Sequence, residues 1–172
     1  GSQRFSTENK HYQDIIKLSG FLAENGISII TKQEEGNVSA ANKGCYEAFS
    51  PDSHSIEIKN KSKYKNEISK YVDISIEENN ENLNENHLIK HSFAFICCKG
   101  GIETLKELFQ IANMIHLGKL NCPPIILFNR EFYNPLIGWI KSTLCENNIS
   151  TKEDVNRLVM LADTWEDVAD IT

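Results

Sequence analysis

The chain has 172 residues, a formal net charge of −6 at pH 7 and 40% hydrophobic residues. This length supports one domain with a substantial core, and we expect a single domain over residues 1–172. No apolar run approaches the roughly 20 residues of a membrane span, so no membrane partner is predicted. The acidic balance argues against nucleic acid, whose phosphates need a basic face on the protein.

The cysteines and one basic stretch lead to two further expectations. The five cysteines show no CxxC spacing and Cys97 and Cys98 are adjacent, so we interpret them as reduced thiols of a cytoplasmic protein. Neither they nor the histidines are paired at ligand spacing, and the sequence predicts no metal site and no cofactor. The basic stretch from Lys59 to Lys70 precedes an acidic run from Glu77 to Glu85, and we interpret it as a solvated surface.

The first half of the chain is predicted to alternate between helix and strand. Apolar residues recur at helical spacing over residues 14–24, and Asn25-Gly26 provides a helix stop. A short apolar strand follows at residues 27–31. The next expected elements are a helix rich in small residues at 36–49, strands at 54–58 and 71–76, and a polar surface loop or exposed helix start at 77–86.

The second half continues this alternation. Residues 93–98 form a continuous apolar run, which is typical of a parallel strand buried on both faces. After Gly100-Gly101 comes a helix that ends at Gly118, with a buried stripe of Leu105, Leu108, Phe109, Ala112 and Ile115. Strands at 125–128 and 159–162, a helix at 136–144 and a short helix from Trp165 complete the chain, and Trp139 and Trp165 are interpreted as packing residues on these helices. The alternation predicts an α/β fold: a Rossmann-like, doubly wound parallel sheet with helices on both faces.

The turn after Cys98 is the strongest candidate for chemistry. In open parallel sheets, ligands bind beyond the carboxyl ends of the strands, where helix N-termini present N–H groups to anions. Gly100 and Gly101 let the backbone approach a ligand, Thr104 offers a hydroxyl, and Glu107 lies one helical turn further. A phosphate held at this turn would leave Glu107 near an attached sugar. A tight turn with a purely structural role is the alternative interpretation of the spacing.

The stretch from Phe95 to Phe109 resembles the P-G-G-x-G-T-x-x-E signature of the LOG family of cytokinin riboside 5′-monophosphate phosphoribohydrolases. Residues 40–44 match the family's A-A-N-K-G helix, and residues 1–5, 71–77 and 124–136 resemble further family segments in the same order. The resemblance implies a Rossmann-like fold, a homodimer and a pocket for a nucleoside monophosphate such as AMP. It also implies a further strand before Gly1.

The resemblance implies roles for individual residues. Glu107 falls on the signature glutamate, which assists ribosyl cleavage in the family. Gly36 is the glycine that remains of a Gly-rich loop after the family's second strand, and Asn42 lies in the A-A-N-K-G helix. The implied catalytic residue is Glu107, and the implied ligand-binding residues are Gly36, Asn42, Gly100, Gly101 and Thr104.

Three departures from the family pattern fall on the same site. Lys99 and Glu103 replace the proline and a glycine of the signature, and residues 32–35 replace glycines of the loop before Gly36. The family's R-K pair falls on Asn84-Glu85, so its arginine is absent. A missing cation and an added carboxylate both disfavour a bound dianion, which predicts that phosphoribohydrolase activity is weakened or lost.

These observations leave three functional hypotheses. The leading one is a LOG-like protein that hydrolyses nucleoside 5′-monophosphates to base and ribose 5-phosphate, with activity reduced or abolished. The second is a non-catalytic nucleotide-binding or sensing module. The third is a pseudoenzyme that acts only as a dimerisation partner. A compensating cation from Lys99 or Lys32 is the alternative to loss of activity.

Overall fold

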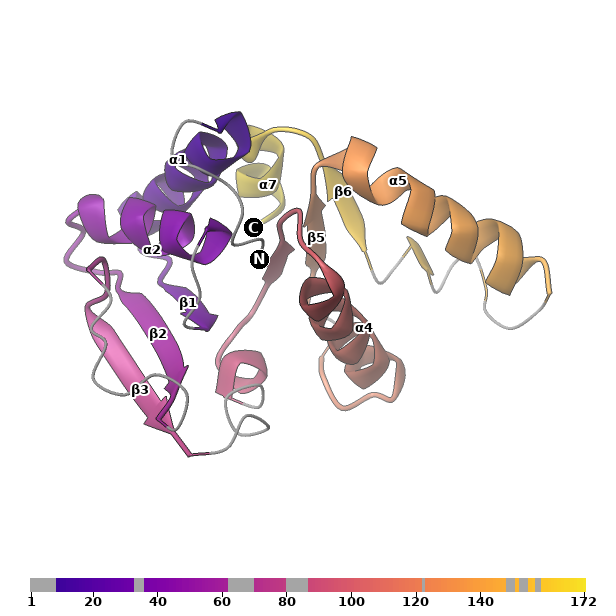
Figure 1. Cartoon of the computed structure of the whole chain (residues 1–172), viewed down its shortest axis with the longest axis horizontal. Coiled ribbons are helices and arrows are strands. Elements are labelled where there is room, and N and C mark those ends of the chain that lie inside the picture. Colours follow the sequence, from indigo (N-terminus) through magenta and orange to yellow (C-terminus); the bar gives the residue numbers. More distant parts are fainter. Residues whose placement is uncertain are drawn as a thin grey trace. The chain divides into compact units, whose positions relative to one another are not determined.

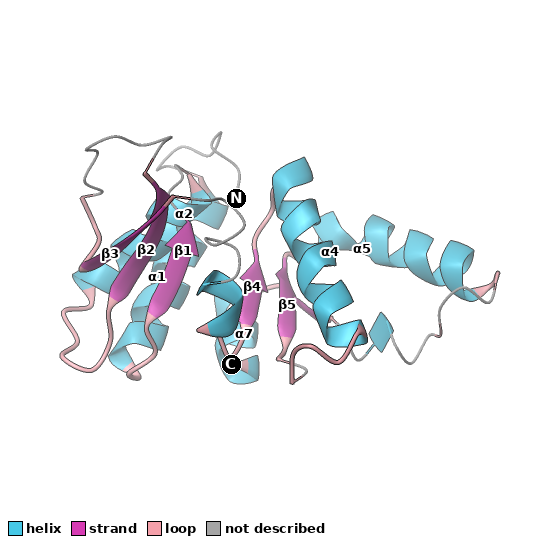
Figure 2. Ribbon diagram, turned by 90° about the horizontal axis from the view of Figure 1, so that it is seen from below, coloured by secondary structure: helices cyan, strands magenta, loops and turns pink. Residues whose placement is uncertain are grey.

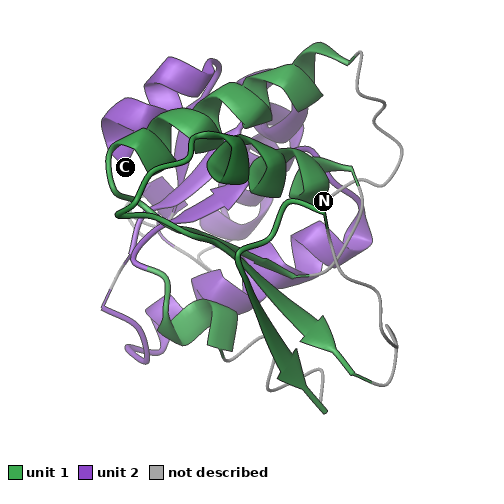
Figure 3. Cartoon of the chain, turned by 90° about the vertical axis from the view of Figure 1, so that its left-hand side faces the viewer, with its two compact units in different colours: residues 1–92 green, residues 93–172 purple. Residues whose placement is uncertain are grey.

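The computed structural model describes residues 9–32, 36–61, 70–79, 87–121, 123–147, 151, 155–156 and 159–172. The chain divides into two compact units, Gly1–Ser92 and Phe93–Thr172, which are coloured separately in Figure 3 and are described here one at a time. The expectation of a single domain and that of a strand before Gly1 stay predictions. Within the described residues, no helix is long and apolar enough to cross a bilayer.

Unit 1 contains a three-stranded parallel sheet and two helices. Its elements are α1 (Lys10–Glu24), β1 (Ile29–Lys32), α2 (Asn37–Glu47), β2 (Ser55–Asn60) and β3 (Ile74–Glu78). The strand order is β1-β2-β3, and both pairings are parallel. Helix α2 contacts β1 and β2, and α1 packs against α2 (Figure 1). Asn9 begins α1, because its side chain accepts a hydrogen bond of 2.9 Å from the His11 N–H.

Two glycines allow the close contact between α1 and α2. A Cβ atom added at Gly44 would overlap the carbonyl oxygen of Ile16 and the hydroxyl of Ser19, and would lie 2.9 Å from the Ile16 carbonyl carbon. A Cβ atom added at Gly20 would lie 3.4 Å from the Gly44 carbonyl oxygen. The helix backbones therefore approach each other here. The last glycine of the A-A-N-K-G segment is thus explained by helix packing.

One face of β2 is polar and buried. Ser55, Glu57 and Lys59 alternate along the strand and are 0%, 2% and 6% exposed. The Lys59 Nζ atom lies 3.0 Å from the Glu77 Oε1 atom on β3, and this ion pair lowers the pKa of Glu77. The interpretation of Lys59 as part of a solvated surface is wrong, because the strand directs this side chain to the covered face of the sheet.

Unit 2 contains the second three-stranded parallel sheet (Figure 2). Its elements are β4 (Phe95–Cys97), α4 (Ile102–His116), β5 (Ile125–Phe128), α5 (Arg130–Trp139), the π-helix η1 (Ile140–Cys145), β6 (Met160–Ala162) and α7 (Trp165–Ile171). The strand order is β4-β5-β6, and every residue of the central strand β5 is at most 1% exposed. Helix α7 packs on β5 and β6. Parallel strands separated by helices are what the sequence predicts for the α/β class.

Three expected features of unit 2 differ in the structure. Helix α5 begins at Arg130 and not at residue 136, because the Asn129 side chain accepts a hydrogen bond of 2.9 Å from the Phe132 N–H and caps the helix. Helix α4 buries Thr104, Leu108 and Ile111, whereas Phe109 is 45% exposed. Apolar side chains surround much of α4, so periodicity alone does not select the buried face. Trp139, interpreted as a packing residue, is 54% exposed.

Candidate functional site at the glycine turn

The turn between β4 and α4 ends in an open helix N-terminus. Gly101 is the N-cap of the 15-residue helix α4 and has an extended backbone with φ −90° and ψ −156°. Its carbonyl oxygen accepts the first intrahelical hydrogen bond from the Leu105 N–H at 3.1 Å. The N–H groups of the first turn have no intrahelical acceptor and carry the positive end of the helix dipole. This end of α4 is therefore suited to an anion.

The two glycines of the turn have different structural roles. A Cβ atom added at Gly100 would overlap the Thr104 hydroxyl and lie 2.6 Å from the Thr104 Cβ atom. A Cβ atom added at Gly101 would have no atom within 4 Å. Gly100 thus makes room for Thr104, which is only 7% exposed, whereas Gly101 borders open space. The open space at this turn therefore lies at Gly101 and not at Gly100.

Glu107 lies one turn after Thr104 and is half-buried. Burial, followed by the neighbouring Cys98 and the Glu107 carboxylate, raises the pKa of Cys97 at the end of β4 to about 12. Burial also raises the pKa of Cys98 to about 12. The Glu107 carboxylate is therefore close enough to the end of β4 to affect the Cys97 thiol. Both thiols are therefore protonated near neutral pH, and a protonated thiol is a poor nucleophile.

Glu103 is directed to the surface of α4. Its Oε1 atom lies 3.3 Å from the Lys106 Nζ atom, and the two side chains are 53% and 48% exposed. This i,i+3 pairing compensates part of the carboxylate charge next to the turn, and solvent screens the remainder. The repulsion between Glu103 and a bound dianion is consequently weaker than the sequence alone suggests.

Gly36 and Asn42 both belong to unit 1, at the N-cap and in the middle of α2. Gly36 is the N-cap of α2 with φ 72° and ψ −121°, a conformation that only glycine adopts readily. Asn42 is 3% exposed, and its Oδ1 atom accepts a hydrogen bond of 2.9 Å from the Thr31 hydroxyl near the carboxyl end of β1. This oxygen joins α2 to the sheet. Residues 1–5, 33–35 and 84–85, on which further family positions fall, lie outside the described residues.

Tyr133 was not assigned a role from the sequence. Its phenol, 1% exposed, donates a hydrogen bond of 2.7 Å to the carbonyl oxygen of Cys98, which leads into the glycine turn. Burial, followed by the two neighbouring thiols, raises the pKa of this phenol. The resemblance at residues 124–136 marks this segment, but nothing in it indicates a contact with β4.

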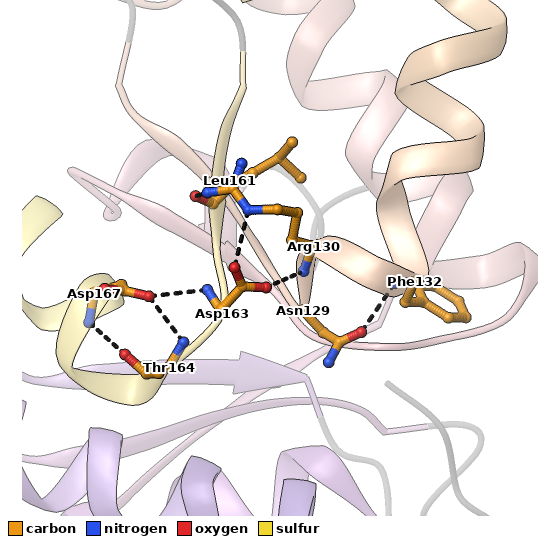
Figure 4. A network of polar contacts seen from close by, with 7 residues as sticks. All are labelled: Asn129, Arg130, Phe132, Leu161, Asp163, Thr164 and Asp167. Carbon is orange, nitrogen blue, oxygen red and sulfur yellow. Dashed lines mark hydrogen bonds and ion pairs between the residues drawn. The ribbon is translucent and has the colours of Figure 1, made fainter.

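A polar network fixes the carboxyl ends of β5 and β6 (Figure 4). The Arg130 Nε atom donates to the Asp163 Oδ2 atom at 2.9 Å, and an Arg130 Nη atom donates to the Leu161 carbonyl oxygen at 3.0 Å. Thr164 and Asp167 form a capping box at the start of α7, and the N–H groups of Thr164 and Asp163 lower the pKa of Asp167. Since its members are occupied with each other, this network has a structural role.

The sequence model of the family described as "Possible lysine decarboxylase" matches residues 38–171, which is most of the chain and includes the whole glycine turn. The chain belongs to this family. The resemblance to the LOG family is thereby confirmed.

This family member is also similar to one curated protein and to one solved structure. A cytokinin riboside 5′-monophosphate phosphoribohydrolase of Rhodococcoides fascians is 37% identical over 57 residues, which make up 33% of this chain and 29% of that relative. The chain thus matches less than a third of that protein. The X-ray structure of TM1055, a structural genomics target, has a TM-score of 0.71 at 16% identity and aligns over 99% of this chain and 92% of its own. This likeness confirms the Rossmann-like α/β fold.

Proposed function

We propose that this protein binds a nucleoside 5′-monophosphate such as AMP at the Gly100-Gly101 turn, with phosphoribohydrolase activity that is weakened or lost. The observation that carries the proposal is the open N-terminus of α4 at Gly101, with the half-buried Glu107 on the same helix. The name of the matched relative, a phosphoribohydrolase acting on a nucleoside 5′-monophosphate, supports this choice of ligand.

The proposed chemistry assigns one part of the ligand to each group. The phosphate accepts hydrogen bonds from the N–H groups of the first turn of α4. The Glu107 carboxylate faces the ribose, where it stabilises positive charge on C1′ or accepts a proton from water. The bond between C1′ and the base nitrogen breaks, its electron pair leaves with the base, and the water oxygen bonds to C1′. The base takes up the proton, and the products are free base and ribose 5-phosphate.

Catalysis needs more than the carboxylate, and this is why we propose reduced activity. Removing a preorganised donor from the charge that develops in a transition state lowers a rate by about a hundredfold to a thousandfold. Asn84 stands where the family has its arginine, and Lys99 and Glu103 change the signature itself. Binding of the phosphate depends on backbone groups that these substitutions leave in place.

The test separates binding from turnover. AMP binding is measured by calorimetry, and release of adenine from AMP by chromatography at high protein concentration. We expect AMP to bind, with adenine release slow or at background. Glu107→Ala is expected to keep AMP binding and to remove any residual release.

The possible outcomes discriminate between the hypotheses. Release of base that Glu107→Ala removes shows a weakened phosphoribohydrolase. If several nucleoside monophosphates bind and none loses its base, the activity is lost and the protein is the non-catalytic nucleotide-binding or sensing module. If none binds, the proposal is wrong and the dimerisation module remains.

We include a homodimer in the proposal. Ile102 and Phe109, seven residues apart on α4, are 82% and 45% exposed, and a second copy of the chain would cover this apolar stripe. Light scattering coupled to size exclusion is expected to give twice the chain mass. Phe109→Ser should shift the protein towards the monomer, and a wild-type monomer at all concentrations would contradict the dimer.

A further inference from the structure

Tyr133 connects α5 to the strand that carries the glycine turn. It lies in the second turn of α5, yet its Oη atom donates a hydrogen bond of 2.7 Å to the carbonyl oxygen of Cys98, the residue that follows β4. The Tyr133 side chain is 1% exposed, and Cys98 is half-buried. A partly buried hydrogen bond thus links two segments that are 35 residues apart.

The local structure explains how Tyr133 reaches this position. Strands β4 and β5 are parallel neighbours with Cys97 opposite Leu127, so both end at the same edge of the sheet. Asn129 follows β5 with φ 97°, a value that is unusual for a residue other than glycine, and its side chain caps α5 immediately. The sharp reversal starts the helix at the sheet edge. Tyr133 then falls one turn into α5, beside the end of β4.

The hydrogen bond acts on one peptide plane. The Cys98 carbonyl and the Lys99 N–H belong to the same planar unit, so fixing the oxygen also fixes the direction in which the chain enters Gly100. Burial keeps the phenol protonated and therefore a donor across the neutral pH range. With phenylalanine at position 133, the Cys98 carbonyl would lose this donor and lie beside a ring that offers none.

We propose that Tyr133 is a positioning residue for the ligand. By holding the Cys98-Lys99 peptide, it keeps Gly100, Gly101 and the first N–H groups of α4 in the orientation that binds a phosphate. Tyr133 itself touches no ligand in this arrangement. The inference rests on the proposed function, because it assigns the phosphate to this turn.

The test uses Tyr133→Phe, with Tyr12→Phe as the matched control. Tyr12 is also buried, at 5% exposure, but it lies on α1 of unit 1. Amide hydrogen exchange over residues 98–104 is expected to become up to about tenfold faster in Tyr133→Phe, since a lost hydrogen bond is typically worth up to about a factor of ten. The affinity for AMP should fall about fivefold or more for the same reason. Tyr12→Phe should change neither quantity.

The two readouts distinguish the failure of each idea. Unchanged exchange over residues 98–104 in Tyr133→Phe overturns the positioning role, whether or not the protein binds AMP. Faster exchange with unchanged AMP affinity also overturns it, because Tyr133 would then hold the turn without contributing to AMP binding. If the wild-type protein binds no AMP, the proposed function fails and the ligand part of this inference fails with it, while the exchange data still decide whether Tyr133 holds the turn.

Discussion

Replacing each glycine of the turn by alanine tests the assignment of separate roles to Gly100 and Gly101. Gly100→Ala places a methyl group against the Thr104 side chain, 2.6 Å from its Cβ atom, and Thr104 is itself buried in the first turn of α4. Gly101→Ala places the same methyl group where no atom lies within 4 Å, on a backbone with φ −90° that alanine tolerates. The two substitutions therefore add the same methyl group, one at a crowded position and one in open space.

The magnitudes follow from these contacts. Overpacking of this kind destabilises a protein by about 1 to 3 kcal/mol, so Gly100→Ala should lower the melting temperature by about 2 to 12 °C. Gly101→Ala should change stability by less than about 1 kcal/mol, because an alanine N-cap is slightly unfavourable but the unfolded chain loses entropy. Its AMP affinity should nevertheless fall about tenfold, which corresponds to about 1.4 kcal/mol, since the methyl group enters the space left for the ligand.

Thermal unfolding followed by circular dichroism and calorimetric titration with AMP measure the two effects. In the double variant Gly100→Ala/Thr104→Ala, the loss of stability should be smaller than the sum of the two single losses, because part of the overlap is removed. Equal destabilisation by both glycine substitutions would refute the reasoning. So would tight AMP binding by Gly101→Ala.

Three further predictions concern packing, alkaline stability and charge. Gly44→Ala should reduce the free energy of unfolding by at least about 2 kcal/mol in urea denaturation, because its methyl group meets the backbone of α1. Folding raises the pKa of Cys97 and Cys98 from 9.0 to about 12. The contribution of these protonated thiols to the free energy of unfolding is therefore fully present below pH 9.0 and is lost as the pH rises towards 12. Urea denaturation between pH 7 and 11 should show this decline, and it should be smaller when both cysteines are replaced by alanine. Glu103→Gln should raise the affinity for AMP about twofold to fivefold in low salt, since it removes a screened negative charge from the first turn of α4.

Each of these has a control on the same fold. Gly20→Ala, whose Cβ atom would lie 3.4 Å from the nearest atom, should change stability by no more than about 1 kcal/mol, and a larger loss would mean that the helix contact has been misjudged. An unchanged pH profile in the double cysteine variant would show that other groups cause the alkaline loss. Glu131→Gln removes an exposed acid from the first turn of α5 and should leave AMP affinity unchanged. If Glu131→Gln raises the AMP affinity as much as Glu103→Gln does, the effect comes from the net charge of the protein and not from the position of Glu103.

Local patterns in the sequence were sufficient for the class of fold and for the position of the turn. The apolar run before Cys98 and the helical spacing after Gly101 predict a strand, a turn and a helix within some 25 residues, and the structure has β4 and α4 there. Thr104 and Glu107 lie near the turn because a helix brings residues three and four positions apart to neighbouring places. These relationships depend on contacts between residues that are close in the sequence, and the spacing of apolar residues is sufficient to predict such contacts.

The buried faces were harder to predict. Phe109 and Trp139 were expected to pack inside, and both are about half exposed, while Lys59 was expected on a solvated surface and is buried. A helix with apolar residues around most of its circumference does not indicate which stripe meets the sheet. A lysine in a charged stretch of sequence does not reveal that its strand directs the side chain to the covered face of the sheet. There Lys59 forms an ion pair with Glu77.

The sequence by itself therefore determined the alternation of strand and helix, the family, and the position of the Gly100-Gly101 turn between a strand and a helix. Only the tertiary structure decided which of the two glycines borders open space and that Tyr133 holds the entry to the turn. The physical reason is that these features depend on the direction of side chains and peptide planes, and on contacts between residues far apart in the chain. Such contacts form only when parallel strands align their carboxyl ends at one edge of a sheet.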